Sequence, residues 1–170
     1  APDGSVTTLW EDPEAQAFAV ATAEDGVVYV GTGPGGKVWK ITGESPEVYF
    51  DPGTDYVWDL ALDQAGNLFV ATGPEGKIFR VDTEGSSTLF YDAKQKHVLC
   101  LALGDGGTVY AGTADGGLIY RIGSDGKAFV LYETKENEVR CLLRVEGDVL
   151  YVGTGLPGSV GRRTSTSSSK

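Results

Sequence analysis

A short apolar run passes directly into a glycine-rich turn at residues 68–76, Leu-Phe-Val-Ala-Thr-Gly-Pro-Glu-Gly. Continuous apolar runs of this length are typical of a strand that is buried on both faces. The chain then alternates polar and apolar residues over Lys77–Val81, as a half-exposed strand does. The apolar-rich segment Val57–Leu62 precedes a turn at Asp63–Asn67, and Thr88–Tyr91 follows a later turn. This unit therefore predicts four short antiparallel strands.

The same pattern returns at a nearly constant spacing along the chain. The threonine that ends the apolar run recurs at Thr32, Thr72, Thr113 and Thr154, which are 40, 41 and 41 residues apart. A glycine keeps this spacing at Gly36, Gly76, Gly117 and Gly158, as does an upstream position occupied by Phe18, Trp58, Leu99 and Arg140. So does an aromatic residue followed by an acid, at Trp10-Glu11, Phe50-Asp51, Tyr91-Asp92 and Tyr132-Glu133. Position classes that share one period indicate a tandem repeat.

The repeat resembles the blade of a β-propeller. Residues 63–71, Asp-Gln-Ala-Gly-Asn-Leu-Phe-Val-Ala, are similar to the D-x-x-G-N-L-[FY]-V-A stretch of NHL-repeat, gluconolactonase-like and two-component-regulator propellers. The repeating Gly-His and Trp-Asp signatures of WD repeats are missing. A Trp-Asp pair occurs once, at Trp58-Asp59, but on an innermost strand rather than on the third strand of a blade. The resemblance implies an all-β propeller with four-stranded antiparallel blades of about 40 residues. It implies about four blades in this chain, NHL-like or WD-like, without an assigned subfamily.

The strand count predicts propeller repeats over residues 1–163. Residues 5–11 match the fourth strand of a blade, and blades follow at roughly 15–51, 55–92, 96–133 and 137–163. The third strand of the last blade, expected at residues 158–163, is degraded, since Gly161 stands where Trp39, Phe79 and Tyr120 stand in the other blades. Residues 164–170 are rich in Ser and Thr and predict a flexible tail.

Two interpretations of the ring stay open. The N-terminal strand could complete the last blade and close a four-bladed ring, which would protect the sheet edges. Alternatively, the chain is part of a larger propeller that missing sequence or a second copy completes. In the latter case a homodimer would form an eight-bladed ring.

Composition and charge limit the classes of partner that the chain is expected to bind. The formal net charge of −10 argues against nucleic acid, whose phosphates are bound by clustered Lys and Arg. No apolar run approaches the ~18 residues of a membrane span, so a protein or peptide partner is expected. The chain has no methionine, and its start at Ala1 suits a processed secreted N-terminus or a domain boundary. The location stays open, with a secreted or periplasmic one slightly favoured over the cytoplasm.

Residues 31–37, Gly-Thr-Gly-Pro-Gly-Gly-Lys, fit much of a phosphate-binding loop. That motif needs a following helix, whose N-terminal N–H groups bind phosphate. Here Val38–Ile41 predicts a strand, and the loop recurs at residues 72–77. We therefore interpret it as a hairpin turn and expect no nucleotide and no other cofactor.

The chain has one histidine, His97, which excludes a site that needs two histidines. Cys100 and Cys141 occupy the same place in adjacent blades, where Asp59 and Ala19 are their equivalents. Innermost strands of adjacent blades diverge, so we expect two small buried thiols rather than a disulfide or metal site.

Two sets of residues are candidates for binding. The acids Glu11, Asp51, Asp92 and Glu133 could form a ring that attracts a cation or a basic peptide, or each could cap its own turn by accepting N–H bonds. Residues that differ among blades are better guides to specificity, because loop variation on a fixed scaffold creates sites. This second set contains Trp58, Arg140, Asp55, Tyr56, Lys94, His97 and Lys135.

The sequence favours a non-catalytic propeller scaffold that binds a protein, peptide or small ligand on its loop face. No catalytic residue is identified. The resemblance to regulator propellers implies an extracellular or periplasmic sensory module as an alternative. The resemblance to lactonases implies a metal-dependent hydrolase, but the chain has only Asn67 and Asn137 to supply the asparagine of such a site. An engineered or excised propeller fragment is the last alternative.

Overall fold

The computed structural model of the chain describes residues 4, 6–146, 149–155 and 160–164. The fold is all-β, and its strands form four antiparallel sheets in chain order, which are the blades of a β-propeller. In each blade the strands pair strictly with their sequence neighbours, as in a meander. The part of the chain that the structure describes contains no helix long and apolar enough to cross a membrane.

The blades have the following strands. The first contains β1 (Gln16–Thr22), β2 (Val28–Gly33), β3 (Gly36–Thr42) and β4 (Ser45–Thr54). The second contains β5 (Tyr56–Leu62), β6 (Leu68–Gly73), β7 (Lys77–Val81) and β8 (Ser87–Asp92). The third contains β9 (Val98–Leu103), β10 (Val109–Thr113), β11 (Leu118–Ile122) and β12 (Ala128–Glu133), with a 3-10 turn at Asp105–Gly107. The fourth contains β13 (Val139–Val145), β14 (Val149–Thr154) and β15 (Val160–Thr164).

Local hydrogen bonds explain the turn at Asp63–Asn67 that links the first two strands of the second blade. The carboxylate of Asp63 accepts the backbone N–H groups of Ala65 and Asn67 at 2.9 and 2.8 Å, and it accepts the Asn67 side-chain amide at 2.8 Å. Gly66 takes the left-handed conformation that closes this turn. The D-x-x-G-N motif is therefore the link between the first two strands of a blade, and Asn67 is committed to that turn.

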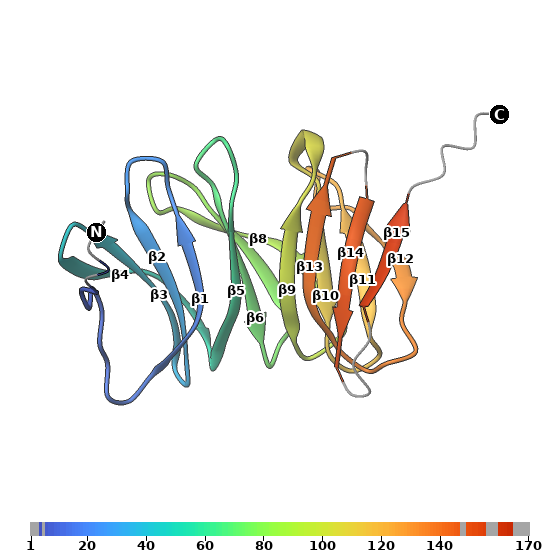
Figure 1. Cartoon of the computed structure of the whole chain (residues 1–170), viewed down its shortest axis with the longest axis horizontal. Helices are drawn as coiled ribbons and strands as arrows, with labels where there is room; N and C mark the ends of the chain where they lie inside the picture. Colours follow the sequence, from blue (N-terminus) through green and yellow to red (C-terminus); the bar gives the residue numbers. More distant parts are fainter. Residues whose placement is uncertain (1–3, 5, 147–148, 156–159, 165–170) are drawn as a thin grey trace.

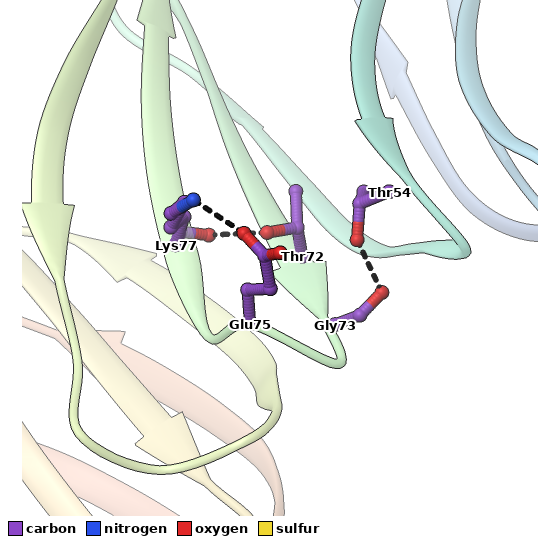
Figure 2. Close-up of polar contacts among 5 residues, drawn as sticks. All are labelled: Thr54, Thr72, Gly73, Glu75 and Lys77. Carbon is purple, nitrogen blue, oxygen red and sulfur yellow. Dashed lines mark hydrogen bonds and ion pairs between the residues drawn. The ribbon is translucent and has the colours of Figure 1, made fainter.

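The recurring threonine fixes the next turn. Thr72 lies at 1% exposure, and its hydroxyl donates to the Lys77 carbonyl at 2.8 Å across the hairpin between β6 and β7 (Figure 2). Thr32 and Thr113 make the equivalent bonds to residues 37 and 118. In Figure 2 the Lys77 ammonium pairs with Glu75. A strand leads out of both loops, β3 from residues 31–37 and β7 from residues 72–77, which confirms the interpretation of the phosphate-like loop as a hairpin turn.

The hydrophobic core lies between blades rather than inside any one of them. One cluster joins the first and second blades and includes Val38 and Val57. A second joins the second and third blades around Ile78 and Val98, and a third joins the third and fourth blades around Ile119 and Val139. Each blade is thus stabilised by burial of its apolar faces against its neighbours.

Polar and aromatic contacts reinforce these packed faces. The Tyr49 hydroxyl donates to the Asp82 carbonyl of the next blade at 2.6 Å. Burial, together with the neighbouring Tyr29, raises the pKa of Tyr49 to about 12. Phe50 packs on Phe79 with ring centroids 5.3 Å apart, which repeats the contact of outer strand on next blade seen elsewhere in the chain.

The four blades form an open arc. They stand side by side, with the N-terminal segment beside the first blade and β15 at the opposite end (Figure 1). The innermost strands contact in sequence, β1 with β5, β5 with β9 and β9 with β13. The interpretation that the chain closes a four-bladed ring on itself is therefore wrong, because the first and last blades lie at opposite ends of the arc (Figure 1).

The chain ends differ from the sequence prediction. Of residues 5–11, expected as an outer strand, the structure describes 6–11, which pair with no sheet, although Trp10 still packs on Trp39 with ring centroids 6.1 Å apart. Thr164, expected in the tail, is the last residue of β15. Gly158 and the rest of the expected tail, residues 165–170, lie outside the described residues.

Candidate functional site

Each innermost strand carries one extra residue at the same place. The register between β1 and β2 steps from Ala17 to Ala19, which leaves Phe18 without a partner opposite it. The corresponding steps leave out Trp58, Leu99 and Arg140 in the other blades. A bulge of this kind bends the strand and redirects a side chain. We call Phe18, Trp58, Leu99 and Arg140 the bulge row; it is the register class that the repeat predicted.

An aromatic cluster surrounds the first half of the bulge row. Trp58 stacks on Tyr56 with centroids 4.6 Å apart and an interplanar angle of 14°. Phe18 meets the Trp58 ring edge-on at 4.9 Å, and His97 also meets it edge-on, at 5.6 Å. These four residues come from three blades, and their contacts join those blades on one face of the arc.

That face, which we call the loop face, carries the Gly-Thr-Gly turns and the segments that cross between blades. The second glycine of these turns makes room for the cluster. A Cβ on Gly73 would lie 2.1 Å from His97 Nδ1 and 2.6 Å from Trp58 Nε1. A Cβ on Gly33 would lie 2.5 Å from the Tyr56 ring. Gly33 and Gly73 are therefore required by the side chains packed over them.

One hydrogen bond orients the polar atoms of the cluster. The Trp58 indole Nε1–H donates to His97 Nδ1 at 3.0 Å, so Nδ1 acts as the acceptor and the proton of the neutral imidazole sits on Nε2. Phe18 is 40% exposed, and Tyr56, Trp58 and His97 are partly exposed. The cluster thus presents a rigid aromatic surface with polar atoms at its edge.

The other predicted binding residues lie apart from the cluster. Arg140, at the far end of the bulge row, is exposed and forms an ion pair with Glu138 at 2.6 Å. Asp55 has an exposed side chain, and its backbone carbonyl accepts the Gly36 N–H at 2.9 Å. Lys94 is exposed in the crossing segment before His97. The structure therefore groups Trp58, Tyr56 and His97, and it leaves the charged candidates around them.

Lys135 lines a separate cavity of about 360 Å³ between the third and fourth blades. Its wall includes Ile119, Tyr132 and Gly161. In the preceding blades an aromatic side chain fills the place of Gly161, as Tyr120 does against Tyr91 at 5.4 Å between centroids. The degraded third strand that the sequence indicated is thus the origin of this cavity.

Each of the four recurring acids precedes an innermost strand in the chain. Asp51 accepts the backbone N–H of Gly53 at 2.9 Å, as a turn-capping residue does. Glu11, Asp92 and Glu133 have exposed side chains. Across the described residues, no three side chains of His, Cys, Asp or Glu are grouped so that they could hold a metal ion.

The position after the bulge row is polar in the second blade. Asp59 accepts the backbone N–H of Leu60 at 2.8 Å and that of Leu101, in the next blade, at 2.7 Å. Burial raises the pKa of Asp59 even though these two N–H bonds act to lower it. Asp59 thereby joins the second and third blades through a partly buried carboxyl group.

Cys100 and Cys141 continue this position in the next two blades, and both are free thiols. Cys100 is buried, donates to the Val139 carbonyl at 3.5 Å and has a pKa that burial raises. Cys141 is exposed, so the expectation of two buried thiols is wrong for this residue. The reason is that the described chain places no further blade over the outer face of the fourth one.

Phe18 was missed as a site residue, although its register with Trp58 provided the signal. Only the stacking in the structure shows that it belongs to the cluster, because periodicity alone assigns a position and not a contact.

Known structures share this fold. A streptogramin B lyase superposes with a TM-score of 0.75 at 16% sequence identity, over 94% of this chain and 58% of that one. Regucalcin, a calcium-binding protein from Agrobacterium tumefaciens, superposes with a TM-score of 0.69 at 14% identity, over 83% of this chain and 54% of that one. The extracellular domain of a hybrid two-component system from B. thetaiotaomicron gives 0.69 at 18% identity, over 86% of this chain and 21% of that one.

No family model and no curated protein sequence matches the chain. The chain spans little more than half the length of the lyase and of regucalcin, and about a fifth of the two-component system domain. Identities this low establish the fold alone, since one fold carries many functions. These three proteins are a lyase, a calcium-binding protein and the extracellular domain of a two-component system, and the fold they share with this chain is the β-propeller.

Proposed function

We propose that this chain is a non-catalytic propeller module that binds a peptide, protein or small ligand through the aromatic cluster of its loop face. The observation that carries the proposal is the joining of Phe18, Tyr56, Trp58 and His97, from three blades, into one partly exposed surface. Aromatic side chains supply large contact area with little loss of conformational entropy. Trp and Tyr also dominate the binding energy of many interfaces.

The shape of the cluster favours a ligand with a flat or apolar group. The stacked rings of Tyr56 and Trp58 are fixed by each other and by Phe18, so little ordering is needed when a ligand binds. The Nε2–H of His97 is oriented by the bond at Nδ1 and can donate to an acceptor on the ligand.

The test uses peptides selected from a displayed library against the 170-residue chain. Trp58→Ala should weaken binding of a selected peptide at least about tenfold, since hot-spot aromatics contribute about 2 kcal/mol or more. Tyr132→Ala is the matched control, because this tyrosine is 53% exposed and lies away from the cluster. Peptides that lose affinity with Tyr132→Ala but not with Trp58→Ala would refute the proposal.

A sensory role is the form of this binding function that the likeness to the two-component system domain supports. In that role a bound ligand would bias the packing of blades that the cluster already joins. The measurement is hydrogen exchange of β1, β5 and β9 with and without a selected peptide. Protection that rises in all three strands supports signalling through the blades, whereas a local change confined to the Trp58 turn contradicts it.

The metal-dependent hydrolase hypothesis makes a different prediction. It requires a divalent metal at the site, and calcium binding is attributed to regucalcin among the similar structures. A calcium titration by calorimetry separates the two. Heat of binding that Trp58→Ala leaves unchanged would favour the metal hypothesis and count against a purely aromatic site.

A further inference from the structure

The end faces of the arc expose side chains whose equivalents in the inner blades are buried. On the fourth blade Val160 is 82% exposed, whereas its equivalents Val38, Ile78 and Ile119 are at 0, 0 and 1%. The latter three pack against the following blade. On the first blade Val20 is 63% exposed, whereas its equivalents Leu60 and Leu101 are at 6 and 7% and pack against the preceding blade.

Each end also holds part of one blade. The fourth sheet has three strands among the described residues, and β15 forms its outer edge. Residues 6–11 carry the sequence pattern of a fourth strand, yet they lie at the other end of the arc beside the first blade (Figure 1). One end therefore lacks the element that the other end has to spare.

The N-terminal segment already occupies the place of an outer strand. Trp10 packs on Trp39 at 6.1 Å, in the same relation as Phe50 to Phe79 at 5.3 Å. Phe50 belongs to the fourth strand of the blade that precedes the one carrying Phe79. Trp10 is thus positioned as if it belonged to a blade before the first, whose three inner strands are not supplied by this part of the chain.

The pairing register predicts how this segment meets β15. Ile78 pairs with Tyr91, and Ile119 pairs with Tyr132, between the third and fourth strands of their blades. By the same register the exposed Val160 would pair with Trp10.

We propose that two copies of the chain associate head to tail, each giving residues 6–11 as the fourth strand of the other's last blade, to close an eight-bladed ring. The same face-to-face packing that joins blades within the arc joins the copies, and both open sheet edges disappear. The occupant of each end face is a second copy because this chain supplies both complementary faces and the missing strand.

Closure also changes the loop face. The bulge row would run on from Arg140 to the Phe18 of the second copy and would double in length. This inference does not depend on the proposed ligand function, because it rests on the end faces alone.

The primary measurement is the absolute mass of the 170-residue chain by light scattering over a range of concentrations. The proposal predicts a mass of twice 17.9 kDa. A mass of 17.9 kDa at every concentration would overturn it, and so would a series of masses that keeps growing, since that would mean open filaments or capping by other chains.

Variants locate the interface. Val160→Lys should raise the dimer dissociation constant more than about tenfold, because a charge would enter an apolar face. Leu89→Lys is the control: Leu89 is 53% exposed on the outer strand of the second blade, and this variant should keep the dimer. A dimer that tolerates Val160→Lys but not Leu89→Lys would overturn the proposed interface.

A peptide of residues 6–14 provides a readout that needs no folded variant. Added in excess, it should occupy β15 and convert the dimer to a monomer, whereas the same peptide with Trp10→Ala should be weaker. If neither peptide shifts the mass of a dimeric sample, residues 6–11 are not the shared strand and the proposal fails.

Discussion

The Trp58 indole donates a hydrogen bond to His97 Nδ1 at 3.0 Å across the boundary between the second and third blades. We expect this pair to stabilise the fold, since a partly buried hydrogen bond contributes about 1 kcal/mol to the free energy of unfolding. Trp58→Phe retains the ring but removes the donor, and His97→Ala removes the acceptor. A double-mutant cycle in urea should give a coupling energy of about 0.5–1.5 kcal/mol. Additive effects of the two substitutions would show that the bond contributes nothing.

Thr72→Val should lower the free energy of unfolding by about 1–2 kcal/mol. The substitution keeps the shape of the side chain but removes the hydroxyl that donates to the Lys77 carbonyl from a site at 1% exposure. Thr83→Val is the control, because Thr83 is exposed in a turn and surface substitutions change stability by less than about 0.5 kcal/mol. If chemical denaturation gave equal losses of unfolding free energy for both variants, the hydroxyl of Thr72 would not stabilise the turn.

Gly161→Phe should stabilise the fourth blade. A phenyl ring at this position enters the cavity of about 360 Å³ beside Tyr132, where an aromatic residue stands in the other blades. Burial of a Phe side chain is worth about 1.5–3 kcal/mol, so we expect a gain of about 1 kcal/mol if the ring is partly covered. Ser87→Phe, at an exposed strand position without a cavity, should bring no gain in thermal unfolding. A lower midpoint for Gly161→Phe would indicate that the cavity cannot accept a ring.

Asp59 should give stability a specific dependence on pH. Burial raises the pKa of Asp59 in the folded protein. In the unfolded chain the carboxyl has its ordinary pKa of about 3.9, so just above that pH the folded state keeps a proton that the unfolded state has lost. More protons are then bound when folded, and the free energy of unfolding falls as the pH rises from about 4 to the raised pKa. The difference between wild type and Asp59→Asn, measured in urea from pH 4 to 7, should decrease over this window. Parallel curves would show that the pKa of the Asp59 carboxyl is not raised in the folded protein.

The sequence was sufficient to predict the blade strands because the repeat presents each weak signal several times. The strands expected at Val57–Leu62 and Lys77–Val81 appear as β5 and β7. The turn at Asp63–Asn67 also appears as expected, since its hydrogen bonds are local and depend on residues within five positions. Position classes that repeat constrain structure through local geometry, which the sequence contains in full.

The site was only partly predictable, because its contacts join residues of different blades. Tyr56 and His97 are 41 residues apart and meet on Trp58, and nothing in the spacing states that their rings touch. The exposure of Cys141 likewise depends on whether another blade covers it. The prediction of a strand that includes residues 6–11 failed because a strand forms only where a partner edge is present, and the sequence pattern does not show where that edge lies.

Because each blade packs only on its neighbours, this chain should begin to unfold at its two end blades. The inner two blades are held on both faces and the outer two on one, so the free energy of opening should rise from the ends toward the middle. Amide protons of β6 and β10 would then exchange last, and those of β1 and β14 first. In such a molecule, cooperativity is a property of neighbouring contacts, and joining the two ends would convert a graded transition into a single one.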